Sequence, residues 1–136
     1  MAAPPVNHRI ASCACGEVSV KTPLDPVRVS ICHCYACQKR TGSTFAQQAR
    51  FAFEDIEIDG STKVYTRTAD SGNQIHFHFC EHCATVMYYH LEADPTLCAV
   101  PVGVFADADF PAPDYSVYEE RMHKWVALPD DMEHVF

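Results

Sequence analysis

Apolar and polar residues alternate in short runs along most of the chain, a pattern typical of half-buried β-strands. The alternation begins at residues 8–12 and 16–22, on either side of a turn at 13–16, and returns at 27–31. Further strands are predicted at 44–53, 63–68, 74–79, 85–91, 97–105 and 115–119. Turn residues separate these runs about every 8 to 12 residues, and no long helical period or internal repeat occurs. The sequence therefore predicts a mainly β domain.

A short helix is the one interruption expected in this pattern. It should cover residues 35–40 and end near Gly42, because glycine is favoured just after a helix. Residues 1–7 contain two prolines and no periodicity, and we expect a flexible N-terminal arm there. Residues 8–136 are enough for a single domain with a sizeable core. The apolar segment 125–128 is expected to dock on the body of that domain.

Composition and charge remove several classes of function. The formal net charge is −8, from 10 Lys and Arg against 18 Asp and Glu, so the protein would repel a nucleic-acid backbone. No apolar stretch approaches the ~18 residues of a membrane-spanning helix. The start of the sequence has no charged region followed by an apolar run, which predicts a cytoplasmic protein without a signal peptide. In that reducing compartment the eight cysteines are expected to be metal ligands or free thiols.

The segment Cys32-His33-Cys34-Tyr35-Ala36-Cys37 places three thiols within six residues. In an extended chain residues 32 and 34 point to the same side, so His33 would point away. Cys37 follows Cys34 at the two-residue spacing of zinc knuckles. Three thiolates leave one of the four positions of a tetrahedral zinc ion open, as in catalytic sites. The alternatives are a reactive thiol cluster and ordinary buried cysteines.

Two cysteine pairs far apart in the sequence supply a complete set of four thiolates: Cys13 with Cys15, and Cys80 with Cys83. A zinc ion bound by all four would be closed and structural, and would join the first hairpin to the middle of the sheet. The seven cysteines can also be divided in other ways, among which composition does not choose. Cys98 lies in the apolar run 97–100 and is expected in the core.

These motifs occur in a fixed order, which is Cys-x-Cys-Gly, Cys-His-Cys-x-x-Cys with Thr41-Gly42 behind it, Phe79-Cys80-x-x-Cys83, Gly103 and Trp125. From about Ser12 to Leu128 the chain resembles the glutathione-dependent formaldehyde-activating enzyme family, which includes centromere protein V and belongs to the Mss4-like folds. The resemblance implies twisted, mostly antiparallel β-sheets with short helical turns, stapled by two zinc ions per chain. It implies a structural zinc at Cys13, Cys15, Cys80 and Cys83, and a catalytic zinc at Cys32, Cys34 and Cys37.

For activity, the resemblance implies a carbon–sulfur lyase that acts on the adduct of a thiol, such as glutathione, with a small aldehyde such as formaldehyde. Thiolate ligands on an open metal also suit a sulfur-containing substrate on chemical grounds. The alternative is a non-catalytic scaffold or protein-interaction module in which both zinc ions are structural, as in Mss4-like relatives. A third hypothesis is a redox or metal-sensing role through exposed thiolates.

Three residues depart from the family pattern. Gln38 stands where the family often has Arg, Ala84 where it usually has Gly, and Ser116 where it often has His. Ala84 would lose backbone freedom if its turn requires a positive φ. Gln38 and Ser116 bear on the substrate, so these departures concern the exact reaction.

An anionic thiol such as glutathione requires a local positive patch in so acidic a protein. Lys39 and Arg40, directly after the three cysteines, are the leading candidates for substrate binding, followed by Arg50 and Lys124. Lys39 and Arg40 would equally well be solvated charges that balance the dipole at the end of the helix. For a general acid or base the candidates are histidines, His33, His76 and His78, and each is expected to have a structural or surface role.

Overall fold

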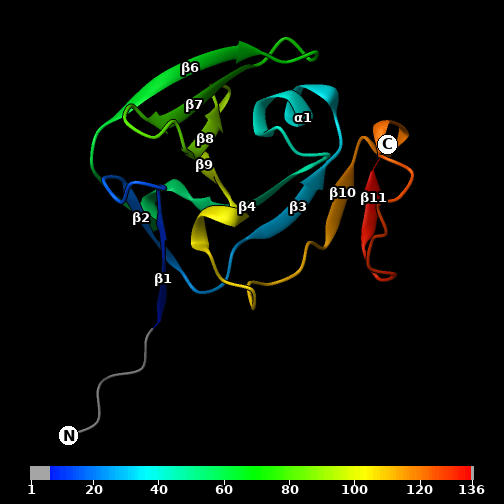
Figure 1. The fold of residues 1–136 in the computed structure, drawn as a ribbon, viewed down its shortest axis with the longest axis horizontal. Coiled ribbons are helices and arrows are strands. Elements are labelled where there is room, and N and C mark those ends of the chain that lie inside the picture. The colour runs from blue at the N-terminus through cyan, green and yellow to red at the C-terminus, as the bar shows by residue number, and fades with distance from the viewer. Residues whose placement is uncertain (1–6, 136) are drawn as a thin grey trace, which may run out of the picture.

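The computed structural model describes residues 7–135, so the predicted arm at 1–7 lies outside the described residues except for Asn7. The described chain is mainly β, as predicted, and forms two sheets (Figure 1). The small sheet has the order β1 (His8–Ser12), β2 (Ser19–Pro23), β5 (Glu57–Asp59). The large sheet has the order β11 (Glu133–Val135), β10 (Tyr115–Val117), β3 (Arg28–Cys32), β4 (Ala46–Ala52), β9 (Asp94–Pro101), β8 (Val86–Leu91), β7 (Gln74–Cys80), β6 (Thr62–Thr68).

Helical structure in the described chain is brief. One α-helix, α1 (Tyr35–Thr41), is accompanied by three short 3-10 helices, η1 (Phe53–Asp55), η2 (Val102–Phe105) and η3 (Glu119–Arg121). Cys34 caps the start of α1, and Gly42 ends it with a left-handed φ of 72°, where a glycine avoids the steric penalty of a side chain. The predicted helix and its end are therefore confirmed.

The large sheet curls so that α1 lies between its two ends. In Figure 1, β6 and β7 lie above the helix, and β3 and β10 lie beside and below it. One face of the sheet is thereby directed toward α1. The opposite face packs against the small sheet, which carries β1 and β2 at the left of the view.

Alternation along each strand decides which residues reach each face. On β3, Val29 is buried in the core, whereas Arg28 and Cys32 face the α1 side, where they line a cavity. On β4 the core residues are Ala49 and Phe51. The core is completed mainly by apolar residues of β2, β8 and β9, which are Val20, Met87, Tyr88, Cys98 and Val100. Cys98 is fully buried, as predicted.

Three features of the fold differ from the sequence predictions. Most strand pairs are antiparallel, but β10 runs parallel to both β3 and β11. The strand β11 was not predicted, because three residues are too few to show alternation. Trp125 was expected to dock on the body but is 71% exposed, in a segment with turns and no strand or helix that would hold it against the core.

Candidate metal centres and the cavity beside them

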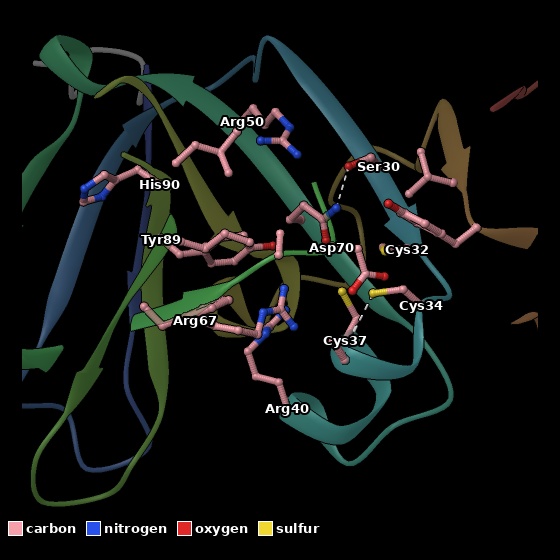
Figure 2. A pocket seen from close by; sticks show the side chains of 18 of the residues that line it. Ser30, Cys32, Cys34, Cys37, Arg40, Arg50, Arg67, Asp70, Tyr89 and His90 are labelled. Carbon is pink, nitrogen blue, oxygen red and sulfur yellow. Dashed lines mark hydrogen bonds between the residues drawn. The ribbon is translucent and has the colours of Figure 1, made fainter. Parts of the chain in front are cut away.

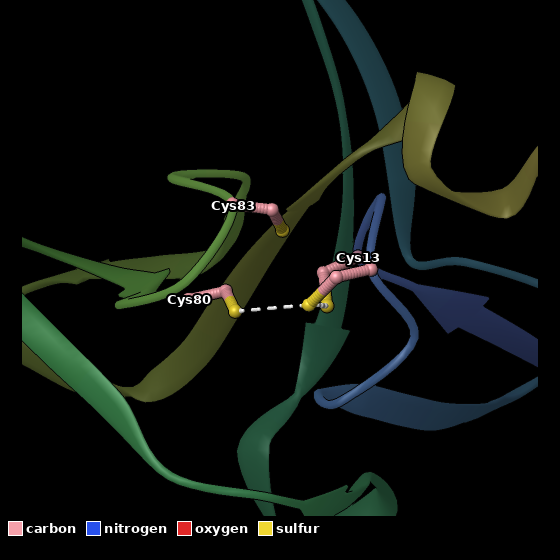
Figure 3. A group of neighbouring side chains, drawn as sticks. Cys13, Cys80 and Cys83 are labelled. Atoms are coloured by element: carbon pink, nitrogen blue, oxygen red, sulfur yellow. Dashed lines mark hydrogen bonds between the residues drawn. The ribbon is translucent and has the colours of Figure 1, made fainter.

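Cys13, Cys15, Cys80 and Cys83 converge between the two sheets, with all four sulfur atoms within 4.8 Å of one another (Figure 3). The Sγ atom of Cys15 lies 3.6 Å from that of Cys13 and 3.6 Å from that of Cys80. A disulfide would require about 2.05 Å. A zinc ion with Zn–S bonds of about 2.3 Å in tetrahedral geometry places its ligand sulfurs about 3.8 Å apart. The spacing and the all-thiol donor set therefore fit a zinc ion.

The backbone around this cluster directs hydrogen bonds to its sulfurs. The amide of Val18 donates to Cys13 Sγ at 3.2 Å. Cys83 Sγ lies 3.2 Å from Thr85 Oγ1, and this contact, together with backbone hydrogen bonds from Thr85 and Cys15, lowers the pKa of Cys83 to about 5. Donors that stabilise the thiolate favour metal binding, because a coordinated cysteine must be deprotonated.

The turn that presents Cys80 and Cys83 is closed by the amide of Ala84, which donates to the carbonyl of Cys80 at 2.8 Å. Ala84 has a φ of 65°, which is the left-handed region that favours glycine. The strain expected at this position from the sequence is therefore present.

Cys32, Cys34 and Cys37 form the second group, in which the three sulfur atoms also lie within 4.8 Å of one another. Cys32 ends β3, Cys34 is the N-cap of α1, and Cys37 lies in its first turn. The amide of Cys37 donates to Cys34 Sγ at 3.3 Å. Within residues 7–135, no fourth His, Cys, Asp or Glu belongs to this group.

Packing three thiols together separates their acidities. Hydrogen bonds from Cys32 and Cys37 hold the pKa of Cys34 far below its usual range. Hydrogen bonds with Cys34, and to a smaller extent with Cys37, raise the pKa of Cys32 far above the usual range of a thiol. Without a metal, Cys34 is therefore the thiolate of the group, and Cys32 and Cys37 keep their protons. A metal ion bound to all three sulfurs must displace the remaining protons.

Three polar residues outside the cavity, His33, Gln38 and Ser116, hold the backbone next to the second group in place. His33 points away from the cysteines, as predicted; it is fully buried, with Nε2 3.2 Å from Ser116 Oγ. Burial lowers the pKa of His33, so its ring favours the neutral form. Gln38 Nε2 donates to the carbonyls of His33 and Arg121, at 2.8 and 3.1 Å. Gln38 and Ser116, which depart from the family pattern, thus lie outside the cavity. Gln38 fixes the backbone at His33 and Arg121, and Ser116 fixes the ring of His33.

A cavity of about 380 Å³ lies between the curled sheet and α1, and all three cysteines of the second group line it. In Figure 2, Cys34 and Cys37 are on one side of this cavity, Arg50 is above, and Arg40 and Arg67 are below. The hydroxyl of Tyr89 points toward the middle. Burial raises the pKa of Tyr89, so the phenol remains protonated.

The other candidates from the sequence lie in different surroundings. Arg40 and Arg50 line the cavity, whereas Lys39 and Lys124 are exposed and do not. His76 and His78 lie on the opposite face of the sheet, near His90, and His78 stacks on Tyr88 with ring centroids 4.3 Å apart. Among the residues that the structure describes, neither joins a group that could hold a metal ion.

Several cavity residues were missed by the sequence analysis, most importantly Arg28, Arg67 and Tyr89. A signal for Arg28 was present, because it shares strand parity with Cys32 and therefore its face of β3. Polar positions on a strand ordinarily face solvent, and only the curl of the sheet turns this face into a cavity wall.

Comparisons with known proteins identify a similar fold and a family for this chain. No curated protein matches the chain. A crystal structure of a Rhodobacter sphaeroides protein is similar in fold, with a TM-score of 0.55 and 20% identity over 70% of this chain and 85% of that one. No helix of the described chain is long and apolar enough to cross a membrane. The model of the glutathione-dependent formaldehyde-activating enzyme family matches residues 8–121. This protein, with its two cysteine groups and curled sheet, is therefore a member of that family.

Proposed function

We propose that this protein is a zinc-dependent enzyme of the carbon–sulfur lyase type, which forms or cleaves the adduct of a thiol with a small aldehyde. Cys32, Cys34 and Cys37 hold the catalytic zinc in this proposal. The four cysteines at the junction of the two sheets, Cys13, Cys15, Cys80 and Cys83, hold a structural zinc. Glutathione is the leading candidate thiol and formaldehyde the leading aldehyde, in keeping with the name of the family. The expected location is the cytoplasm.

The observation that carries this proposal is that the three-cysteine group opens onto a cavity large enough for a small ligand. A structural zinc is normally closed by four protein ligands, whereas a catalytic zinc keeps a position for water or substrate. No fourth ligand from the described residues joins Cys32, Cys34 and Cys37. A scaffold with two structural metals would need such a ligand, and the enzyme is therefore favoured over the scaffold.

The reaction joins the thiol sulfur to the aldehyde carbon, and the thiol proton goes to the carbonyl oxygen; cleavage is the reverse. A bound zinc ion supplies Lewis acidity and stabilises a thiolate near neutral pH. The protein residues orient the substrate and handle the proton. Tyr89 is protonated and points into the cavity, so it can donate a hydrogen bond to the oxygen that gains negative charge.

The test compares two cysteine-to-alanine substitutions in protein purified with its metals. Cys34→Ala removes a ligand of the open site and is expected to lower the zinc content from two ions per chain to one. It should also slow the exchange between formaldehyde and S-hydroxymethylglutathione, measured by nuclear magnetic resonance, at least 100-fold, a loss of about 2.7 kcal/mol of transition-state stabilisation. The circular dichroism spectrum should be unchanged.

Cys98→Ala is the matched control, because Cys98 is buried in the core and belongs to neither cysteine group. It should retain both zinc ions and the wild-type exchange rate. Undiminished exchange in Cys34→Ala would overturn the proposal. Two zinc ions that resist chelation, in a wild-type protein that does not accelerate the exchange, would favour the scaffold.

A further inference from the structure

We propose that the cavity contains a separate oxyanion subsite, formed by Arg28 and Arg50, which binds a carboxylate or phosphate group of the substrate away from the metal. This inference rests on the proposed function for the identity of the reacting sulfur, and it adds the residues that bind the far end of the substrate. The substrate is an elongated thiol with a terminal oxyanion. A small neutral thiol lacks the group that this subsite recognises.

The charge of the cavity is opposite to that of the protein as a whole. The chain carries a net charge of −8. Five arginines but only two aspartates line the cavity; the arginines are Arg28, Arg40, Arg50, Arg67 and Arg121. In the part of the chain that the structure describes, none of the five takes part in an ion pair. So much unpaired positive charge in a concave site attracts and concentrates anions.

Four of the partly exposed cavity arginines also lack an acceptor for a buried nitrogen atom. The Nε atoms of Arg28, Arg40, Arg50 and Arg67 are buried and have no hydrogen-bond partner among the described residues. Arg9, outside the cavity, shows how a structural arginine is satisfied here: it donates to the Leu24 carbonyl at 3.0 Å and to Asp107 at 2.7 Å. The cavity arginines therefore retain donors for a ligand.

Arg28 and Arg50 are the pair that defines the subsite. They are direct partners across the antiparallel strands β3 and β4, and both line the cavity. Like charges directly opposite one another destabilise a sheet. An oxyanion between them would replace this repulsion with two charge-assisted interactions, and the guanidinium fork matches carboxylate and phosphate geometry.

Among the described residues, aromatic rings, not carboxylates, contact four of the five cavity arginines, all except Arg50. The Arg28 guanidinium lies over the ring of Tyr115, at 4.5 Å from its centroid. Arg40 lies over Phe77 and Tyr89 at 4.9 and 5.0 Å. A ring contacts the flat face of the guanidinium and leaves the N–H groups at its edge free. This arrangement orders the side chain and keeps its donors available for a ligand.

The distance between this subsite and the metal site sets the length of the ligand. Arg28 and Cys32 are four residues apart on β3, about 13 Å at ~3.3 Å per residue. Between them lies Ser30, to which Gln48 Nε2 donates at 2.8 Å, while Gln48 Oε1 has no partner. Because arginine side chains can reach back along the strand, a ligand the length of a two- or three-residue peptide can span the two sites at ~3.4 Å per residue.

The test measures anion binding by the zinc-loaded protein, independently of turnover. Two probes are titrated by calorimetry at low ionic strength: inorganic phosphate, and S-methylglutathione, whose sulfur is blocked but whose two carboxylates are intact. The cavity variant is Arg28→Gln with Arg50→Gln. The control is Lys39→Gln with Lys124→Gln, which removes the same charge from exposed positions outside the cavity.

We expect the cavity variant to bind the preferred probe at least tenfold more weakly than the wild type, and the control to stay within about twofold. Arg50→Lys keeps the positive charge but loses the forked guanidinium, so its affinity for the probe should lie between those of the cavity variant and the wild type. It replaces the cavity variant in the test if the double variant does not fold. Tighter binding of phosphate would indicate a phosphorylated thiol, and tighter binding of S-methylglutathione a carboxylated one. Equal weakening in the cavity variant and the control, or no binding of either probe by the wild type, would overturn the subsite.

Turnover measurements separate this inference from the proposed function. Formaldehyde exchange is compared for glutathione and for 2-mercaptoethanol, a small neutral thiol without a carboxylate. In the cavity variant the KM for glutathione should rise about tenfold with little change in kcat, while the kinetic constants for 2-mercaptoethanol should be unchanged. A wild type that catalyses neither exchange but binds the probes through Arg28 and Arg50 would refute the proposed function alone. Catalysis that is identical in the cavity variant and the control would refute the subsite alone.

Discussion

Ala84→Gly is predicted to stabilise the protein, because the change removes strain from the turn that presents Cys80 and Cys83. Ala84 has a φ of 65°, and it is exposed, so deleting its methyl group sacrifices little burial. A non-glycine residue in the left-handed region costs roughly 1–2 kcal/mol. Glycine opposes part of this gain, since its greater freedom in the unfolded chain costs about 0.4–1 kcal/mol. The expected net gain is therefore about 0.5–1 kcal/mol.

For a domain of this size such a gain raises the midpoint of thermal unfolding by roughly 2–4 °C. The measurement is thermal denaturation of the zinc-loaded protein, followed by circular dichroism at a fixed free zinc concentration, because ligand binding itself shifts the midpoint. Ala14→Gly is the matched control. Ala14 lies in the other half of the same cysteine group, is also exposed, and is not among the residues with positive φ.

Ala14→Gly should lower the midpoint, since there glycine brings only its unfavourable entropy. If Ala84→Gly lowers the midpoint as much as Ala14→Gly does, the turn stores no strain and the reasoning fails. A rise in the midpoint accompanied by a loss of zinc would also contradict it, because the geometry of the turn is expected to be retained.

Two further predictions concern the metals. Cys80→Ala should unfold the chain at room temperature, with loss of zinc and of the β-type circular dichroism spectrum. A structural zinc contributes on the order of 10 kcal/mol, which is comparable with the ~5–15 kcal/mol stability of a whole domain. A folded variant would show that this cysteine group is dispensable for stability. Zinc should leave the three-cysteine group progressively as pH falls. Hydrogen bonds with Cys34 raise the pKa of Cys32, so a proton competes with the metal for this sulfur. Each competing proton weakens metal binding about tenfold per pH unit. Elemental analysis after dialysis at decreasing pH measures this loss, and a zinc content that does not depend on pH would contradict it.

Much of the fold was predictable from local pattern. Alternation located most of the strands, and Gly42 marked the end of α1, because these features depend on a few neighbouring residues. The parallel placement of β10 beside β3 and β11 was not predictable, since nothing within three-residue strands specifies a partner far away in the chain. Trp125 was misjudged for a related reason. An apolar side chain is expected to be buried on average, but whether a surface exists to receive it depends on the tertiary structure.

The candidate site was predictable to a different extent. The structure brings the seven cysteines together in the two groups favoured from their spacing, because a metal site demands specific residue types at short separations. The arginine-lined wall was largely missed, with only Arg40 and Arg50 among the candidates. Arg28 and Arg50 are paired across the neighbouring strands β3 and β4, but Arg67 lies on β6 and joins them only because the sheet curls around α1. A sequence pattern records the parity of each residue along its strand, and it does not record the curvature of the sheet.

The cysteine group between the two sheets also has a consequence for how this chain folds during synthesis, if it binds the proposed metal ion. Cys15 and Cys80, whose sulfurs are in contact, are 65 positions apart in the sequence. During synthesis at about 5–20 residues per second, the first hairpin therefore leaves the ribosome several seconds before its partners exist. The ion cannot be captured by all four sulfurs until the small sheet has docked, a non-local step of the kind that slows folding. With the proposed zinc ion as the metal, zinc supply would then set the proportion of new chains that escape proteolysis, and protein abundance would follow metal availability.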